Sequence, residues 1–147
     1  MGTRSTYRVI QEITTGKKVK KLKQEPLCLI YLQYDGYPSG HPCETAEWLA
    51  SGKVVNGFGM TEELQFNGAG CLAAQLIAKY KQGVGGTYLH ALGERGKCWE
   101  DYLYDIIVKE DYTIEYVAYE NDVVPTEIFR GTPSEFVAKY QKEESNA

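Results

Sequence analysis

The spacing of apolar and polar side chains predicts strands in the first quarter of the chain. Residues 6–14 (TYRVIQEIT) place Tyr7, Val9 and Ile13 on one side and polar residues on the other. This alternation is typical of a half-buried strand. A second extended stretch follows a glycine turn and runs over residues 19–34, with a break at a Glu-Pro pair. Its last part, LCLIYLQY, is apolar on both faces, as in a central strand covered on both sides.

Three segments show helical patterns. Residues 44–50 predict a short helix, and residues 67–83 (NGAGCLAAQLIAKYKQG) predict the strongest helix of the chain. Residues 132–140 predict a final helix, because Thr132 and Glu135 have the spacing of a capping box. Each helix has an apolar stripe that needs a partner surface.

Shorter elements complete the pattern. KVVNGFGM, from residue 53, and PTEIFRG, from residue 125, predict brief extended pieces, and residues 88–90 predict another strand. Thr61, followed by two glutamates, has the composition of a helix N-cap and first turn.

YLYDIIVKEDYTIEYVAY predicts a β-hairpin with a loop at residues 109–111. In that register one face is wholly apolar or aromatic, whereas a one-residue slip would mix the faces. The predicted cross-strand partners on this face are Tyr102 with Ala118, Tyr104 with Tyr116, Ile106 with Ile114, and Val108 with Tyr112.

These elements predict the fold class α+β, with a mainly antiparallel sheet and two or three helices packed on one face. The chain has 147 residues, the size of one ordinary domain. We expect a single domain over residues 1–141 and a frayed C-terminal tail at residues 142–147.

The net charge of −4 and the pI near 5.3 argue against nucleic acid as the main partner, since phosphate binding needs a basic face. The net charge does not exclude a local basic patch. The only dense cluster of cations comprises Lys17, Lys18, Lys20, Lys21 and Lys23. We interpret it as a solvated strand edge or turn, because lysine commonly protects exposed edges.

Four cysteines without close pairing, and no signal segment or long apolar run, predict a reduced cytoplasmic protein with mostly buried thiols and no membrane span. The sequence does not determine the oligomeric state, and a homo-oligomer is one of the alternatives.

MGTR at the start, YLQYDGYPSGH at residues 31–41 and NGAGCLAAQLIAKYK at residues 67–81 occur together. In these motifs the chain resembles a group of small, uncharacterised proteins encoded by bacteriophages and related viruses, over about residues 1–104. The resemblance implies a viral source and an accessory protein in the host cytoplasm. Such a protein would bind a host protein or a small nucleotide signal, with counter-defence as one such role.

The linker after the second strand is the first candidate site. Tyr34 and Tyr37 could stack a base, and His41 could donate to a phosphate near a helix N-terminus. The alternative is structural: the tyrosines pack, His41 caps the helix, and the acids of the first turn repel an anion. As a second function we consider a hydrolase or nucleotide-modifying enzyme that uses His41, oriented by Asp35. A structural role in the virion is a third.

Asn67, Gly68 and Gly70 form a second glycine-rich helix start, which adds to the ligand hypothesis. No convincing strand precedes it and no acid stands near position 90, so it is not a dinucleotide fingerprint. The competing interpretation is close helix-to-sheet packing of small residues, namely Ala69, Gly70, Ala73 and Ala74.

Metal and thiol chemistry have weak signals. His41 with Cys43, and His90 with Cys98, lack the tight pairing of a zinc site, so we expect no metal and no cofactor. A Cys–His nucleophile would need the fold to bring such residues together. The acid pairs Glu62–Glu63 and Glu100–Asp101 are interpreted as solvated faces or as a helix cap. We therefore assign no catalytic residue.

Twelve tyrosines are unusual for this length, and their alternation in the hairpin predicts one aromatic sheet face. That face either packs under a helix or is exposed for a partner. Arg95, Lys97 and Trp99, in the charged loop of residues 92–101, are candidates for a partner-binding edge.

Overall fold

The computed structural model describes residues 2–59 and 61–145, with the side chains of residues 142–145 left aside. A six-stranded sheet has the order β5-β2-β1-β6-β7-β8, and a separate pair joins β3 to β4. The strands are β1 (Ser5–Thr15), β2 (Lys21–Leu32), β3 (Lys53–Val55), β4 (Gln65–Asn67), β5 (Thr87–His90), β6 (Tyr102–Val108), β7 (Ile114–Glu120) and β8 (Thr126–Gly131). The helices are α1 (His41–Ser51), α2 (Gly68–Tyr80), α3 (Pro133–Ser145) and the 3₁₀ helix η1 (Leu92–Glu94).

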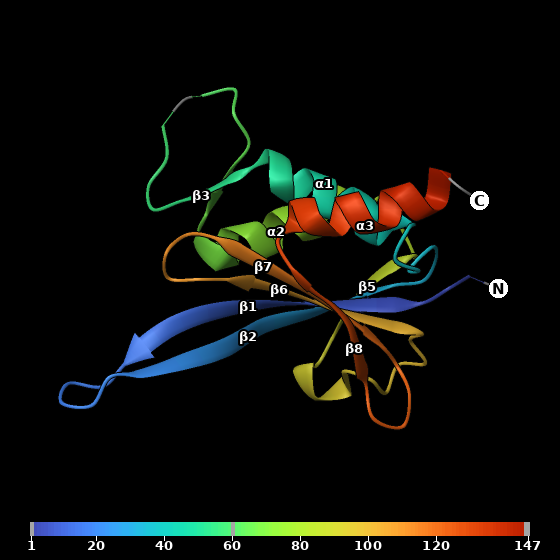
Figure 1. Ribbon diagram of the computed structural model, residues 1–147, viewed down its shortest axis with the longest axis horizontal. Coiled ribbons are helices and arrows are strands. Elements are labelled where there is room, and N and C mark those ends of the chain that lie inside the picture. Colours follow the sequence, from blue (N-terminus) through green and yellow to red (C-terminus); the bar gives the residue numbers. More distant parts are fainter. Residues whose placement is uncertain (1, 60, 146–147) are drawn as a thin grey trace.

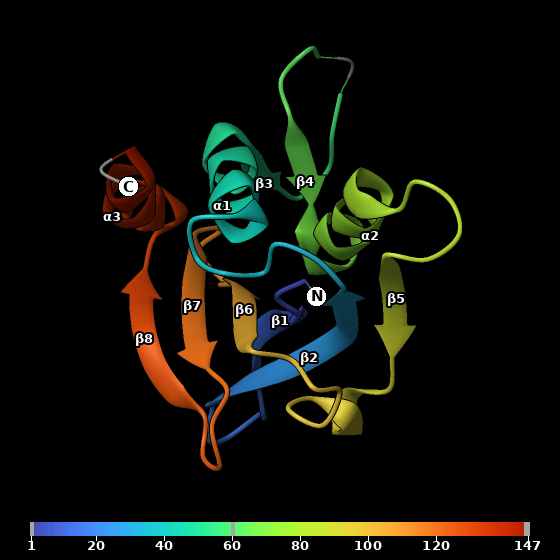
Figure 2. The same ribbon diagram turned by 90° about the vertical axis from the view of Figure 1, so that its right-hand side faces the viewer.

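The predicted fold class is confirmed. Within the large sheet only β1 and β6 run parallel, and every other neighbouring pair is antiparallel. Figures 1 and 2 show α1, α2 and α3 together on one face of this sheet, while η1 and its loop lie on the opposite face. The parallel β1–β6 pair is the central connection between the two halves of the sheet.

The main core lies between the sheet and the three helices. Tyr7, Tyr104 and Tyr116 are fully buried there and pack with Leu72 and Phe136. The aromatic sheet face is therefore a core face beneath helices, which confirms that alternative for the hairpin. The rings contact one another directly, with Tyr116 stacked on Phe136 at a centroid distance of 4.7 Å.

The register of the β6–β7 hairpin differs from the prediction by two residues. Tyr104 pairs with Ala118, and Val108 pairs with Ile114, so the connection is five residues long. Tyr112 has a positive φ of 68° in this connection and is exposed, instead of pairing with Val108. Because a shift of two preserves the side-chain alternation, every strand residue still lies on the predicted face.

The helix ends differ from the predictions at several places, and α2 stops at Tyr80 instead of reaching Gly83. α1 begins at His41, three residues early, and no helix starts at Thr61, whose hydroxyl instead accepts from the amide of Glu63 in a short turn. α3 extends to Ser145, so most of the predicted frayed tail is helical; residues 146–147 lie outside the described residues. The capping box is confirmed, since Thr132 and Glu135 exchange hydrogen bonds of 2.9 and 3.2 Å.

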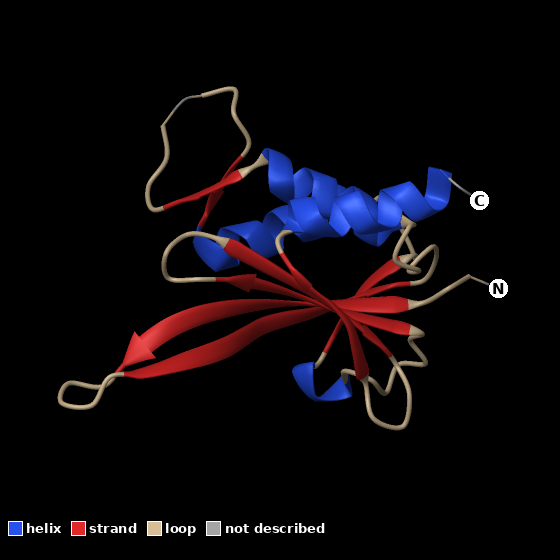
Figure 3. Ribbon diagram, in the orientation of Figure 1, coloured by secondary structure: helices blue, strands red, loops and turns tan. Residues whose placement is uncertain are grey.

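The β1–β2 hairpin is much longer than its neighbours. The predicted break at the Glu-Pro pair is a bulge, where Val9 pairs with Cys28 and Ile10 pairs with Pro26. The hairpin projects well beyond the helices (Figure 3). Its lysines are exposed at the turn and on β2, as predicted. In the part of the chain that the structure describes, no helix has the length and apolar character needed to cross a membrane.

Candidate functional site

The linker between β2 and α1 is folded tightly against the start of the chain. The amide of Gly36 donates to the carbonyl of Thr3 at 2.9 Å, and the amide of His41 donates to the carbonyl of Asp35 at 3.0 Å. A Cβ at Gly36 would lie 2.6 Å from the Ser5 side chain, and one at Gly40 would collide with the Asp35 carbonyl oxygen. The glycines of DGYPSGH are thus required by close packing.

Three tyrosine hydroxyls hold this linker to the core. Tyr104 donates to the carbonyl of Gly36 at 2.7 Å, and Tyr116 donates to the carbonyl of Pro42 at 2.9 Å. Tyr80 donates to the carbonyl of His41 at 3.3 Å. Burial raises the pKa of all three tyrosines, so the hydroxyls stay protonated and remain donors.

His41 is a buried part of the same network, with only 9% of its surface exposed. Its Nδ1 lies 2.8 Å from the Tyr7 hydroxyl, and its Nε2 lies 3.3 Å from Ser5 Oγ. Burial lowers the pKa of His41 to about 4, so the ring is neutral at pH 7. A neutral imidazole has one donor and one acceptor, and these two hydroxyls satisfy both.

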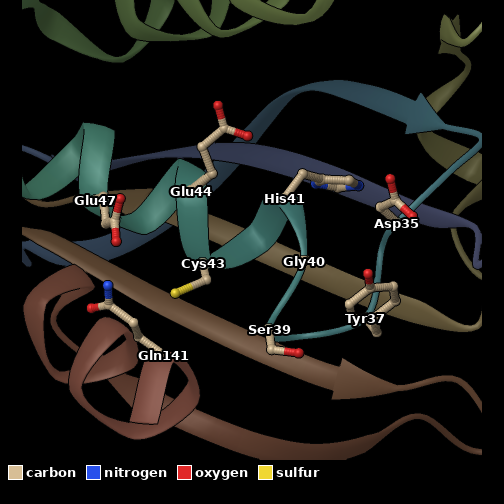
Figure 4. A pocket seen from close by; sticks show the side chains of 9 residues that line it. All are labelled: Asp35, Tyr37, Ser39, Gly40, His41, Cys43, Glu44, Glu47 and Gln141. Carbon is tan, nitrogen blue, oxygen red and sulfur yellow. The ribbon is translucent and has the colours of Figure 1, made fainter. Parts of the chain in front are cut away.

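A cavity of about 340 Å³ lies outside the linker (Figure 4). The structure brings Asp35, Tyr37 and His41 to this cavity, whereas Tyr34 is exposed elsewhere and does not line it. The described lining residues are Asp35, Tyr37, Ser39, Gly40, His41, Cys43, Glu44, Glu47 and Gln141, with three carboxylates and no lysine or arginine. This charge disfavours a phosphate.

The start of α1 offers little to an anion. The amide of His41 already donates to Asp35, and the amides of Cys43 and Glu44 donate to the carbonyl of Gly40. Pro42 has no N–H group. An anion site at a helix start depends on N–H groups that have no other partner. The geometry of the linker therefore matches the structural interpretation of the motif.

Asn67, Gly68 and Gly70 lie apart from the linker. The short strand β4 directly precedes this helix start, so the expectation that no strand precedes it is wrong. The Asn67 side chain accepts from the amide of Gly57 at 2.8 Å, and Gly68 has a φ of 80°, which favours glycine. The five best-formed cavities among the described residues include none of these three positions.

The packing interpretation of this helix start holds only in part. Ala69 and Ala73 are buried against the sheet, as that interpretation requires, while Gly70 and Ala74 are exposed. The two buried alanines lie four residues apart and so share one face of α2.

The loop between η1 and β6 is anchored from below by Glu100. Its carboxylate accepts from the Thr6 hydroxyl at 3.0 Å and from the amides of Gly96 and Cys98 at 3.0 and 2.7 Å. Glu100 is 3% exposed, so its interpretation as part of a solvated acidic face is wrong. The burial depends on the loop folding back onto β1, which no local sequence pattern signals.

Arg95 also faces the sheet instead of the solvent. Its guanidinium lies 3.6 Å from the buried carboxylate of Asp105 and stacks over the ring of Tyr119 at 5.0 Å. Arg8 binds the same carboxylate through two hydrogen bonds of 2.9 and 2.7 Å. Arg95 therefore holds the loop on the sheet and is not free to contact a partner. The other two candidates for the partner-binding edge, Lys97 and Trp99, are exposed.

Trp99 is the most unusual side chain of the loop. It is 83% exposed and has a φ of 63°, a conformation that non-glycine residues rarely adopt. It lines a hollow of about 460 Å³, formed by Tyr31, Gln33, Tyr88, His90, Glu94, Lys97, Cys98 and Trp99. It also borders a second hollow of about 390 Å³ that includes Lys97 and Asn121. We call Tyr31, Tyr88, His90, Lys97 and Trp99 the Trp99 surface.

The fold brings His90 and Cys98 together on this surface, with the Cys98 sulfur 3.6 Å from Nδ1 of His90. Burial, with Glu100 and Glu94, raises the pKa of the Cys98 thiol. The thiol donates to the carbonyl of Glu94 at 3.2 Å and stays protonated, so it lacks the character of a nucleophile. The described residues contain no cluster of three or more metal-binding side chains.

Cysteine burial is lower than the sequence predicts. Only Cys43 is buried; Cys28 and Cys98 are half-buried and Cys71 is exposed.

Comparisons with known proteins give no match to a family model, a curated protein or a solved structure.

Proposed function

We propose that the protein is a non-enzymatic binding protein that engages a partner protein through the Trp99 surface. The observation that carries this proposal is the exposed indole of Trp99, held on a positive-φ backbone above two hollows. Tryptophan is the residue type most enriched among interface hot spots, and the neighbouring tyrosines and lysine give a mixed aromatic and polar surround.

The backbone at Trp99 supports this assignment energetically. A left-handed conformation costs an L-residue about 1–2 kcal/mol. Because the indole of Trp99 is exposed, no hydrophobic burial in this protein offsets that cost. Strain of this kind persists where the surroundings impose it and clusters at functional positions. Here Glu100 fixes the amides on both sides of residue 97, and Asp105 fixes Arg95. The loop is thus ordered before a partner arrives, which reduces the entropic cost of binding.

The resemblance to small virus-encoded proteins suggests that the partner is a host protein. A small nucleotide is the second candidate, because Tyr31 and His90 have ring centroids 5.3 Å apart in a hollow of ligand size. A base could stack on these rings while Lys97 contacts a phosphate. The acidic cavity beside the linker is less suited to such a ligand.

An enzyme that uses His41 finds little support in the geometry. Both ring nitrogens of His41 contact buried hydroxyls, and the low pKa of the ring makes it a poor proton acceptor at pH 7. The contact between Asp35 and His41 runs through the backbone.

Affinity capture from host lysate tests the proposal. Trp99→Ala and Lys97→Glu should each abolish capture of a partner while the variants unfold at the wild-type temperature. Phe58→Ala is the matched control, since Phe58 is a similarly exposed aromatic residue on the β3–β4 loop. Equal capture by wild type and Trp99→Ala would contradict the proposal. A thermal shift with nucleotides that is lost in Trp99→Ala, without any captured protein, would favour the nucleotide instead.

A further inference from the structure

The β1–β2 hairpin ends in an arm that no other element of the sheet supports. The last pair between β1 and β6 joins Gln11 to Val108, and from Glu12 to Thr15 the first strand pairs only with β2. Thr14, near the far end of this segment, donates a 2.7 Å hydrogen bond to Glu110 in the β6–β7 connection. Four residues per strand, at roughly 3.3 Å each, carry the turn about 13 Å beyond the last β1–β6 pair. Figures 1 and 3 show the arm extending past the helical layer.

The arm carries most of its charge in one sign. Five lysines lie within residues 17–23, whereas the whole chain has a net charge of −4, so the rest of the molecule is acidic. Lys23 forms a long, exposed ion pair of 3.5 Å with Glu25. Lys17, Lys18, Lys20 and Lys21 form no ion pair with any described residue. Lysine commonly protects exposed edges, and at its apex this arm gathers four lysines without an ion pair to any described residue.

We propose that the arm binds the phosphate backbone of a double-stranded nucleic acid. A two-stranded β ribbon fits the major groove, which is about 12 Å wide and 8.5 Å deep, and the arm is long enough to enter it. Lysines at the turn then reach phosphates on both sides of the groove. The projection keeps the acidic body away from the duplex, which a flat basic face on the same body would not do.

The side chains at the apex indicate binding without sequence preference. The tip carries lysines, Val19 and Leu22, with Val19 69% exposed, and it lacks the arginine and asparagine that read base edges. Lysine contacts to phosphate position a protein and carry no sequence information. This arm and the Trp99 surface share no residue, so the two proposals stand on separate observations.

Fluorescence anisotropy with a labelled 30-base-pair duplex of arbitrary sequence tests the arm, using the full chain. We expect binding at 50 mM salt that weakens by about a hundredfold at 200 mM, as four phosphate contacts predict. Replacing Lys17, Lys18 and Lys20 together by glutamine should weaken binding at least tenfold, whereas replacing all three by arginine should preserve it. Lys53→Gln controls for the loss of a lysine elsewhere, and Trp99→Ala should bind the duplex as the wild type does.

Several results would overturn this proposal. These are no duplex binding at 50 mM salt, duplex binding unchanged by the glutamine replacements, or binding to phosphatidylserine vesicles without binding to duplex. Circular dichroism of each variant shows whether the fold is intact. Loss of duplex binding in the arm variant together with normal partner capture would separate this activity from that of the Trp99 surface.

Discussion

The hydroxyl of Tyr7 on β1 lies 2.8 Å from Nδ1 of His41 at the first turn of α1. Tyr7 is fully buried and His41 nearly so. This contact ties the DGYPSGH linker to the centre of the sheet. It also places an ionisable ring where burial disfavours its charged form, so stability depends on pH.

The first prediction concerns that dependence. The pKa of His41 falls from 6.5 in the unfolded chain to about 4 in the folded protein, so the unfolded state binds more protons between these values. Stability is therefore fully present above pH 6.5 and decreases as the pH falls toward 4, by about 3 kcal/mol. Urea unfolding between pH 7 and 4.5 measures it. His41→Gln should flatten the curve; equal slopes in wild type and His41→Gln would refute the assignment.

The second prediction concerns the tyrosine hydroxyls that hold the linker. Tyr104→Phe keeps the ring but leaves the buried carbonyl of Gly36 without its 2.7 Å donor. An unsatisfied buried acceptor costs about 1–3 kcal/mol, so the variant should unfold at correspondingly lower urea. Tyr112→Phe removes an exposed hydroxyl and should change stability by less than about 0.5 kcal/mol. A Tyr104→Phe protein as stable as the Tyr112→Phe protein would show that the bond contributes little.

The third prediction separates strain from binding at position 99. Glycine adopts the left-handed conformation freely, whereas alanine does not, so Trp99→Gly should be about 1 kcal/mol more stable than Trp99→Ala. Both variants should lose partner binding, because both lack the indole. Thermal unfolding compares them. If Trp99→Ala proved the more stable, the positive φ of 63° would not be a source of strain.

The fourth prediction concerns the anchor of the loop. Glu100→Gln replaces one of the two carboxylate oxygens by an NH₂ group. That group cannot accept a hydrogen bond, so at least one of the donors from Thr6, Gly96 and Cys98 loses its acceptor. Amide hydrogen exchange in residues 93–101 should accelerate, with a loss of stability of about 1–3 kcal/mol. Glu94→Gln changes an exposed acid of the same loop and serves as the control. Unchanged exchange in Glu100→Gln would show that another contact orders the loop.

Local patterns predicted most of the fold. Alternation placed Tyr104 and Tyr116 on the correct face, and the Thr132–Glu135 box placed the start of α3. The hairpin register was missed because a two-residue shift keeps the same faces, so hydrophobicity alone does not distinguish the two. The early start of α1 at His41 was missed because it depends on the Asp35 carbonyl, which the folded linker supplies.

The candidate site was less predictable because its geometry comes from contacts distant in sequence. Trp99 could be chosen from residue type alone, since tryptophan is enriched among interface hot spots, and Lys97 was chosen with it as its neighbour in the charged loop. The inward turn of Arg95 requires Asp105 to be buried beneath it, and the burial of Glu100 requires Thr6 on a strand 94 residues away. The role of His41 likewise depends on Tyr7, which no spacing in the chain connects to it.

Site-specific photo-crosslinking in cells that express the protein tests the central proposal most directly. A photoreactive amino acid at position 94 lines the same hollow as Trp99, and one at position 34 lies on the exposed part of the linker motif. The account predicts a discrete crosslinked partner from position 94 that disappears when Trp99 is alanine, and none from position 34. A partner crosslinked from position 34 and absent from position 94 would contradict it.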